Sequence, residues 1–245
     1  MGAHIALMLI QMATTLAPAA VPFGVGEVFE YSARSGFLRP GSAWLRVEKI
    51  EPMRGVPSWH FSFESRVNIA GLYKNQSRLD SWTGVGDFIS RRFLKVITEN
   101  DTSKREDFRI HPDSGFFRRG ADTGTKAISD RPIDDVAFFY FVRTVPLAVN
   151  STYRWDMYWR KAKNPVSVRV LKREEMKLPD GTKVQCLVLH PVVGEENGMF
   201  SKKSNARLWI TDDARRIPVQ IQSSYGFGTV KLVLVKMQLA TTASR

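Results

Sequence analysis

The alternation of apolar and polar residues in several segments constrains the fold more than any other feature of this sequence. In SWHFSFESRV, residues 58–67, Trp59, Phe61 and Phe63 alternate with polar side chains, and SAWLRVEKIE, residues 42–51, has a related spacing. Because successive side chains of a strand point to opposite faces, a period of two predicts half-buried β-strands.

Turn-forming residues separate these segments about every ten residues. Gly, Pro, Asn and Asp gather in RPGS at 39–42, RGVPS at 54–58, KNQS at 74–77, ENDTS at 99–103, HPDSG at 111–115, LPDGT at 178–182 and YGFG at 225–228. Many strands joined by short turns favour antiparallel pairing. The sequence therefore predicts a mainly β fold, built as a curved antiparallel sheet or half-barrel.

One segment, SDRPIDDVAFFYFVRTVPL at 129–147, has the pattern of a helix instead. Ser129 or Asp130 is the expected N-cap, Pro132 falls in the first turn, and Pro146 ends the helix, which we expect over about residues 132–143. The acidic pair 134–135 suits the positive end of the helix dipole. The helix is apolar on nearly all sides, so we expect it to pack on the concave side of the sheet, filling a core or lining a pocket.

The N-terminus has the pattern of an export signal. An apolar stretch over residues 5–16 precedes APAA, which offers cleavage after Ala19, although no Lys or Arg occurs before Arg34. We expect residues 1–20 to be a signal peptide, with a buried or anchoring helix as the alternative. Residues 24–238 are expected to form a single β-rich domain whose two halves meet near residues 144–165.

The charge and the single cysteine limit the classes of partner. A net charge of +12 favours anionic partners, but the basic residues are scattered over the chain. Nucleic-acid binding is not expected, because no basic helix or long basic run is present. Cys186 lies in an apolar segment and is interpreted as a buried hydrophobic residue.

Patterns typical of catalytic and metal sites are not found. The sequence has no nucleophile elbow, no phosphate-binding loop and no dinucleotide fingerprint, and its four histidines are far apart. Asp212 and Asp213 in RLWITDDARRIPVQI, residues 207–221, are interpreted as turn formers, because adjacent carboxylates on a strand diverge. Pro218 lacks a donor for the ladder, so we expect it at an edge or a bulge. No catalytic residue, metal or cofactor is predicted.

Three quoted segments carry a family resemblance. GEVFEYSAR near residue 30, DDVAFFYFVRTVPL in the middle, and RLWITDDARRIPVQIQ followed by GFGTVKLVLV near the end resemble the bacterial exported proteins of domain-of-unknown-function family 3108. The resemblance covers about residues 24–238 and implies a strand-rich periplasmic protein, without an activity that can be carried over. The hairpin is more loosely similar to that of periplasmic lipoprotein-sorting carriers, which implies a curved half-barrel around an apolar cavity.

These observations lead to one principal functional hypothesis. We expect a periplasmic, non-catalytic β-protein that binds a lipidic or amphipathic anionic ligand, or acts in cell-envelope assembly, with peripheral membrane contact. The expected apolar contacts are Phe138, Phe139, Phe141, Trp155 and Trp159. The expected anion contacts are Arg118, Arg119, Lys202 and Lys203. The alternative is an envelope protein or cell-wall interaction module with a packed core, and the third candidate is a hydrolase.

Overall fold

The computed structural model describes residues 21–69, 73–194, 199–225 and 228–240. The expected signal peptide at residues 1–20 lies outside the described residues. Among the residues that are described, no helix has both the length and the apolar character needed to cross a membrane.

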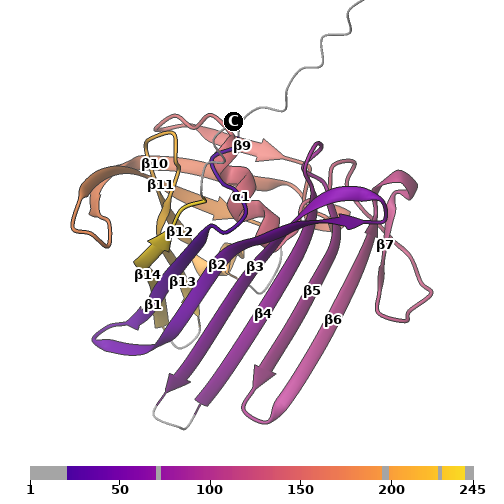
Figure 1. Cartoon of the computed structure of the whole chain (residues 1–245), viewed down its shortest axis with the longest axis horizontal. Helices are drawn as coiled ribbons and strands as arrows, with labels where there is room; N and C mark the ends of the chain where they lie inside the picture. Colours follow the sequence, from indigo (N-terminus) through magenta and orange to yellow (C-terminus); the bar gives the residue numbers. More distant parts are fainter. Residues whose placement is uncertain (1–20, 70–72, 195–198, 226–227, 241–245) are drawn as a thin grey trace, which may run out of the picture.

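The described chain forms one antiparallel sheet of 14 strands (Figure 1). The strands are β1 Val28–Ser35, β2 Leu38–Met53, β3 Val56–Ile69, β4 Tyr73–Gly84, β5 Ser90–Glu99, β6 Thr102–His111, β7 Phe116–Arg119, β8 Lys126–Ala127, β9 Thr152–Trp155, β10 Val166–Lys177, β11 Lys183–Val192, β12 Arg207–Thr211, β13 Pro218–Tyr225 and β14 Gly228–Gln238. Their order is β8-β7-β6-β5-β4-β3-β2-β1-β14-β13-β12-β11-β10-β9. The predicted curved antiparallel sheet is confirmed.

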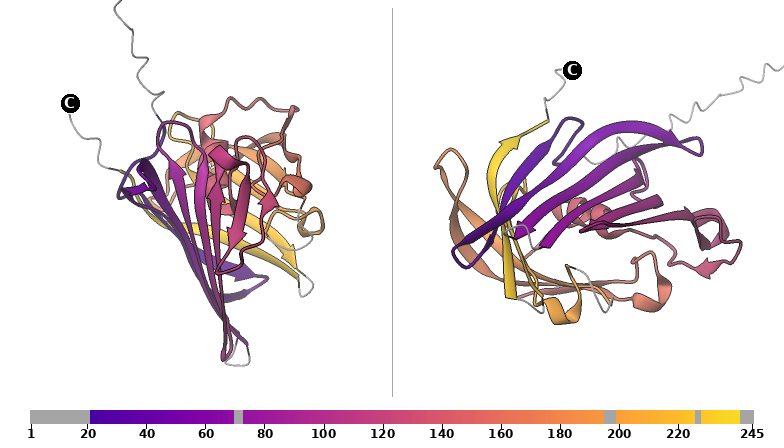
Figure 2. Two further views of the ribbon diagram at one scale, coloured as in Figure 1. Left: turned by 90° about the vertical axis from the view of Figure 1, so that its right-hand side faces the viewer. Right: turned by 90° about the horizontal axis from the view of Figure 1, so that it is seen from below.

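The two chain-terminal strands, β1 and β14, pair in the middle of the sheet. The sheet therefore grows outward from this pair in two meanders, and β8 and β9 end up at opposite edges. Figure 2 shows the two wings of the sheet curving toward each other, with the helix α1, Asp135–Thr144, between them. The link from β8 to β9 contains this helix, so it crosses the concave side from one edge of the sheet to the other.

The alternating pattern of β3 sets the faces of the sheet. Phe61 is fully buried on the concave side and stacks on Tyr140 of α1 with a centroid distance of 3.8 Å. Phe63 stacks on Phe139 at 6.0 Å. An aromatic helix buried against an aromatic strand face contributes dispersion and apolar burial that a surface helix would lack.

The helix is confirmed, but its start differs from the prediction. It begins at Asp135, and its N-cap is Asp134, whose carboxylate accepts hydrogen bonds from the backbone amides of Val136 and Ala137 at 3.0 Å. The predicted caps Ser129 and Asp130 and the predicted first-turn residue at 132 lie before the helix. The Ser129 hydroxyl instead donates to the carbonyl of Tyr158, so tertiary contacts replace the capping role there.

Of the seven predicted turn segments, four are confirmed and two are wrong, while the middle of YGFG at 225–228 lies outside the described residues. The segments at 54–58, 99–103, 111–115 and 178–182 contain turns between neighbouring strands, whereas RPGS lies within β2 and KNQS within β4. In RPGS, a Cβ on Gly41 would lie 1.9 Å from the carbonyl oxygen of Arg66. This glycine therefore allows close approach of β2 to β3, and the turn is formed by residues 36 and 37 instead.

The two faces of β14 are covered unequally. Leu232 and Leu234 are buried on the concave side, but Val235 is 42% exposed. The apolar run of this strand is therefore covered on one face only.

Candidate functional site

A hollow of about 970 Å³ lies on the concave side of the sheet, next to the helix. It is bordered by the inner side of the long strands, by α1, by residues 158–163 and 199–201, and by β13 and β14. The helix therefore covers a packed aromatic core with part of its surface and lines the hollow with another part. The hollow is at the upper end of the roughly 300–1,000 Å³ range of small-molecule sites.

Alternate residues of the strands line the wall of the hollow, because successive side chains of a strand point to opposite faces. On β3, every second residue from Phe63 to Ile69 lines it, and on β4 Asn75, Ser77 and Leu79 do so. The register aligns these positions across the sheet, since Phe63 pairs with Leu79. The wall also includes apolar residues from other elements, namely Val136, Phe139, Val193, Met199, Phe200, Ile221, Val230 and Leu232.

Among the described residues, three cationic side chains line the hollow, namely Lys95, Arg160 and Lys163. Lys95 lies opposite Glu106 in the β5–β6 ladder, but Glu106 forms its ion pairs with Arg119 at 2.5 Å and Lys104 at 3.5 Å. None of the described carboxylates lies within ion-pair distance of Lys95. Apolar walls and cations thus occur in one concave space.

The structure brings together two of the five predicted apolar contacts. Phe139 and Trp159 line the hollow, and Trp159 also packs on Phe108 and Phe117, each with a centroid distance of 4.7 Å. Phe138 is buried against Phe200, 5.4 Å away.

The other two predicted apolar contacts pack on each other. The ring of Phe141 contacts the ring of Trp155 edge-on at 5.2 Å, and neither residue lines the hollow. The reason is rotational: successive residues of α1 point in different directions, so four consecutive aromatics cannot share one pocket.

The predicted anion contacts are dispersed. Arg119 pairs with Glu106 at the border of the hollow, whereas its neighbour Arg118 points to the opposite face, over the ring of Phe116. Lys202 and Lys203 are exposed in the short 3-10 helix η3, Lys202–Ser204, and do not line the hollow.

Sequence reasoning missed Lys95 and the wall positions of β3 to β5. The sequence shows only that Lys95 and Ile97 lie on alternate positions of one strand. Only the register shows that they continue the face that begins with Phe63.

Asp134 sits at the buried N-terminus of the helix, next to the hollow. Burial raises the pKa of this carboxyl to about 7, although backbone and hydroxyl donors oppose the shift. The Ser81 hydroxyl donates to it at 2.6 Å, and the Ser90 hydroxyl accepts from the Asp134 backbone amide at 3.0 Å. The cluster fixes the helix onto β4 and β5.

The three segments with the family resemblance converge on a buried ion pair outside the hollow. Arg143, at the end of α1, donates to both oxygens of Glu27, at 2.6 and 2.9 Å. Its guanidinium also donates to the backbone carbonyls of Pro22 at 2.8 Å and Arg215 at 3.2 Å. The motifs therefore join the start of the domain, the helix and the hairpin turn, which is a structural role.

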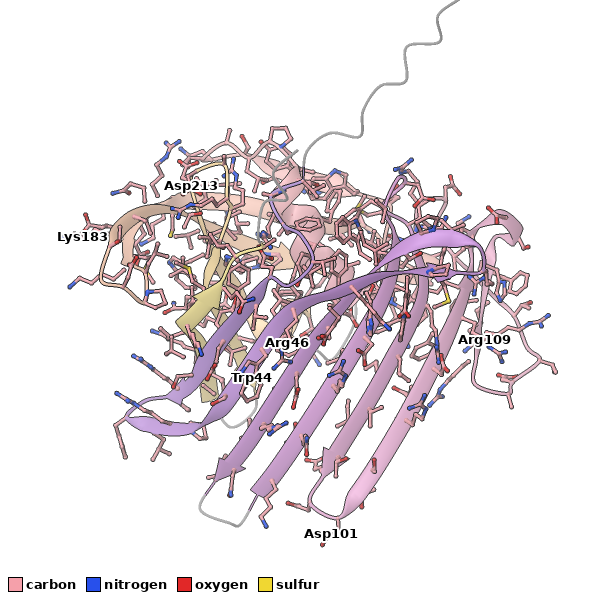
Figure 3. The ribbon with its side chains drawn as sticks, in the orientation of Figure 1. Trp44, Arg46, Asp101, Arg109, Lys183 and Asp213 are labelled. Carbon is pink, nitrogen blue, oxygen red and sulfur yellow. The ribbon has the colours of Figure 1, made fainter. Side chains whose placement is uncertain are left out.

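Asp213 is confirmed as a turn former of the β12–β13 hairpin, whereas the Asp212 carboxylate pairs with Arg173 at 2.6 Å and with Arg216 at 3.4 Å. Asp213 accepts from the Thr211 hydroxyl at 2.6 Å and from the backbone amide of Arg215 at 3.0 Å. Figure 3 places Asp213 at the opposite end of the molecule from Asp101, which marks the β5–β6 turn. Pro218 lies at a register shift of the β12–β13 ladder, as expected for a bulge.

The remaining polar candidates lie apart from the hollow. His60 contacts Asp80 at 2.8 Å on the convex face of the sheet, on the side of β3 opposite Phe61. Cys186 is buried as predicted, and burial raises the pKa of its thiol to about 12. Within the described residues, no three His, Cys, Asp or Glu side chains are arranged to hold a metal ion.

Comparison with known proteins places the chain in a family. The model of the family "Protein of unknown function (DUF3108)" matches residues 30–235. The crystal structure of a β-barrel-like protein of the domain-of-unknown-function family DUF1849 from Brucella abortus is similar, with a TM-score of 0.54 and 12% identity over 89% of this chain and 99% of that chain. At that identity the likeness shows the fold alone, and no curated protein matches the chain. The chain therefore belongs to the DUF3108 family.

Proposed function

We propose that the concave hollow binds the apolar part of an amphipathic anionic ligand, such as a lipid. The observation that carries this proposal is the hollow itself, about 970 Å³ between the aromatic helix and the inner faces of β3 and β4. Its apolar wall would gain about 25 cal/mol for each Å² of apolar surface that a ligand removes from water.

Lys95 supports the anionic part of the proposal. It lies in the wall of the hollow, and the carboxylate opposite it in the ladder is engaged by Arg119 and Lys104. A cation beside an apolar wall attracts a ligand that has a negative head and an apolar tail. Lys163 is a second cation of the same wall.

The hollow also favours this proposal over the two alternatives. An interaction module with a packed core needs no space of this size next to its central helix. A hydrolase needs a nucleophile and a base that converge in a cleft, but the His60–Asp80 contact is on the convex face.

We further propose that the protein is exported to the bacterial periplasm. The apolar stretch at residues 5–16 supports this proposal, and the N-terminal mass of the mature protein tests it.

Two matched variants test whether the ligand occupies the hollow. Ser77→Phe adds a ring to the inner face of β4, where Ser77 lines the hollow, while Gln76→Phe adds the same ring to the exposed outer face of the same strand. Native mass spectrometry and lipid extraction are applied to the protein purified from its own periplasm. We expect an amphipathic ligand on the wild type and on Gln76→Phe, and loss of it from Ser77→Phe. If neither the wild type nor Gln76→Phe carries a ligand or takes up a fluorescent fatty acid, the proposal is wrong.

A second pair of variants tests the role of charge. Lys95→Glu reverses a cation of the wall, and Lys183→Glu reverses one at the distant β10–β11 turn, labelled in Figure 3. We expect Lys95→Glu alone to weaken binding of the fluorescent fatty acid, and to leave binding of its uncharged methyl ester unchanged. Equal loss of both probes would contradict a charge contact.

A further inference from the structure

The convex face carries a second, smaller hollow of about 380 Å³, near the β1–β2 turn. Its wall contains Arg34, Gly36, Gln220, Thr229, Lys231 and Val233. Two of these residues are cations, and none is acidic.

Arg34 and Lys231 face each other directly in the β1–β14 ladder. Like charges opposite each other on neighbouring strands are destabilising. No described carboxylate lies within ion-pair distance of either cation. The pKa of Glu174 is lowered mainly by its hydrogen bond with Lys172, with which it forms an ion pair at 2.8 Å, and the charge of Lys231 contributes less.

One buried polar atom in the wall of this hollow has no hydrogen-bond partner among the described residues. This atom is the Nε of Arg34. The side chain of Gln220 is in the same wall, and that residue is only 9% exposed. An oxyanion between the two cations would accept hydrogen bonds from the Arg34 guanidinium, as phosphate does from arginine. Its negative charge would also reduce the repulsion between Arg34 and Lys231.

The adjoining turn presents an exposed aromatic ring. Ser35 pairs with Leu38, so Gly36 and Phe37 form the turn, and Phe37 is 95% exposed. Figure 1 shows this turn projecting from the body of the molecule at lower left. Leu38 beside it is 49% exposed, and Arg39 follows in an exposed position. Aromatic residues that adjoin cations fit the boundary between lipid headgroups and acyl chains.

We propose that this end of β1, β2 and β14 docks on an anionic phospholipid surface, with a headgroup phosphate between Arg34 and Lys231 and with Phe37 inserted among the acyl chains. The proposal does not depend on the ligand in the concave hollow. Leu38 nevertheless also borders that hollow, so docking at this turn would bring one end of the hollow to the lipid surface.

The test is co-sedimentation of the purified protein with vesicles of phosphatidylcholine alone or mixed with phosphatidylglycerol. We expect binding to the mixed vesicles only. Phe37→Ser should weaken this binding more than about tenfold, because the ring loses its apolar burial. Arg34→Gln should weaken it roughly fivefold, as expected for one surface cation.

Two control variants leave the site intact. Ile50→Ser removes an exposed apolar side chain near the other end of β2, and Arg173→Gln removes an exposed cation on β10 that pairs with Asp212. Both should bind the mixed vesicles as the wild type does. All four substitutions change exposed or half-buried side chains, so a cooperative thermal unfolding transition in each variant verifies that it is folded.

The outcomes separate the lipid surface from a free anion. If the wild type fails to bind the mixed vesicles, the proposal is overturned. It is also overturned if Phe37→Ser binds the mixed vesicles like the wild type while Arg34→Gln loses binding of inorganic phosphate. The smaller hollow on the convex face would then be a site for a soluble anion. Neither result would affect uptake of a fatty acid by the concave hollow, which is measured without vesicles.

Discussion

Replacement of Arg143 by Met should destabilise the fold by about 3–5 kcal/mol, the cost of leaving one member of a buried ion pair without its partner. Glu27 is 1% exposed and receives two hydrogen bonds from the Arg143 guanidinium. The same substitution removes the donors to the carbonyls of Pro22 and Arg215. The methionine chain keeps most of the volume, so the cost arises mainly from the lost charge and hydrogen bonds.

Urea unfolding, followed by tryptophan fluorescence, measures this cost. With a slope of about 2 kcal/mol per M, the midpoint should fall by roughly 2 M. Arg173→Met is the matched control, because the Arg173–Asp212 pair is exposed on the arginine side and should be worth only about 0–1 kcal/mol.

The pH dependence and a double variant sharpen the same prediction. Burial raises the pKa of Glu27, and Arg143 opposes that shift. Without Arg143, the folded state should hold a proton on Glu27 more tightly than the unfolded state does, so the variant should lose stability as the pH rises.

The double variant Glu27→Met, Arg143→Met should lose less free energy of unfolding than the sum of the losses of the two single variants. A cost for Arg143→Met no larger than for Arg173→Met would refute the reasoning.

Three further predictions concern other parts of the fold. Burial raises the pKa of Asp134 from 3.8 to about 7, so the folded state binds a proton on this carboxyl more tightly than the unfolded state does. The resulting stabilisation is present below about pH 4 and should be lost as the pH rises through 7. Thermal unfolding at a series of pH values should show this loss for the wild type and not for Asp134→Asn. The Cys186 thiol, buried and with its pKa raised to about 12, should react with iodoacetamide only when the protein unfolds, and modification of the native protein at neutral pH would contradict its placement. Asp213→Ala should destabilise the protein by roughly 1 kcal/mol by removing acceptors in the hairpin turn, without reducing fatty-acid uptake, and a loss of uptake at unchanged stability would argue against a purely structural role.

Much of the fold could be predicted because the strand pattern is local. Phe61 and Phe63 identify the buried face of β3 by their spacing alone, and the aromatic run of α1 requires burial whatever it packs against. The errors have tertiary causes. Gly41 indicated a turn, but its small size serves the approach of β2 to β3. The cap of α1 is at Asp134 because the residues before it are held by tertiary contacts: the Ser129 hydroxyl donates to the Tyr158 carbonyl, and Ile133 forms a parallel bridge with Tyr158.

The site was less predictable because it is assembled by register and curvature. Phe139 and Trp159 were expected contacts and do line the hollow, but Phe141 and Trp155 pack on each other. Lys95 joins the wall only because its strand pairs with β4 in the register that continues the inner face. No local motif contains that information.

Photo-crosslinking tests the central claim, ligand binding in the concave hollow, most directly. A fatty acid with a diazirine near the end of its chain is bound to the purified protein, irradiated, and its adducts are mapped by peptide mass spectrometry. We predict adducts on the inner positions of β3 and β4, such as Val67 and Leu79, or on Phe139 of the helix, and their loss in Ser77→Phe but not in Gln76→Phe. Adducts confined to the convex face, or unchanged by Ser77→Phe, would contradict the claim.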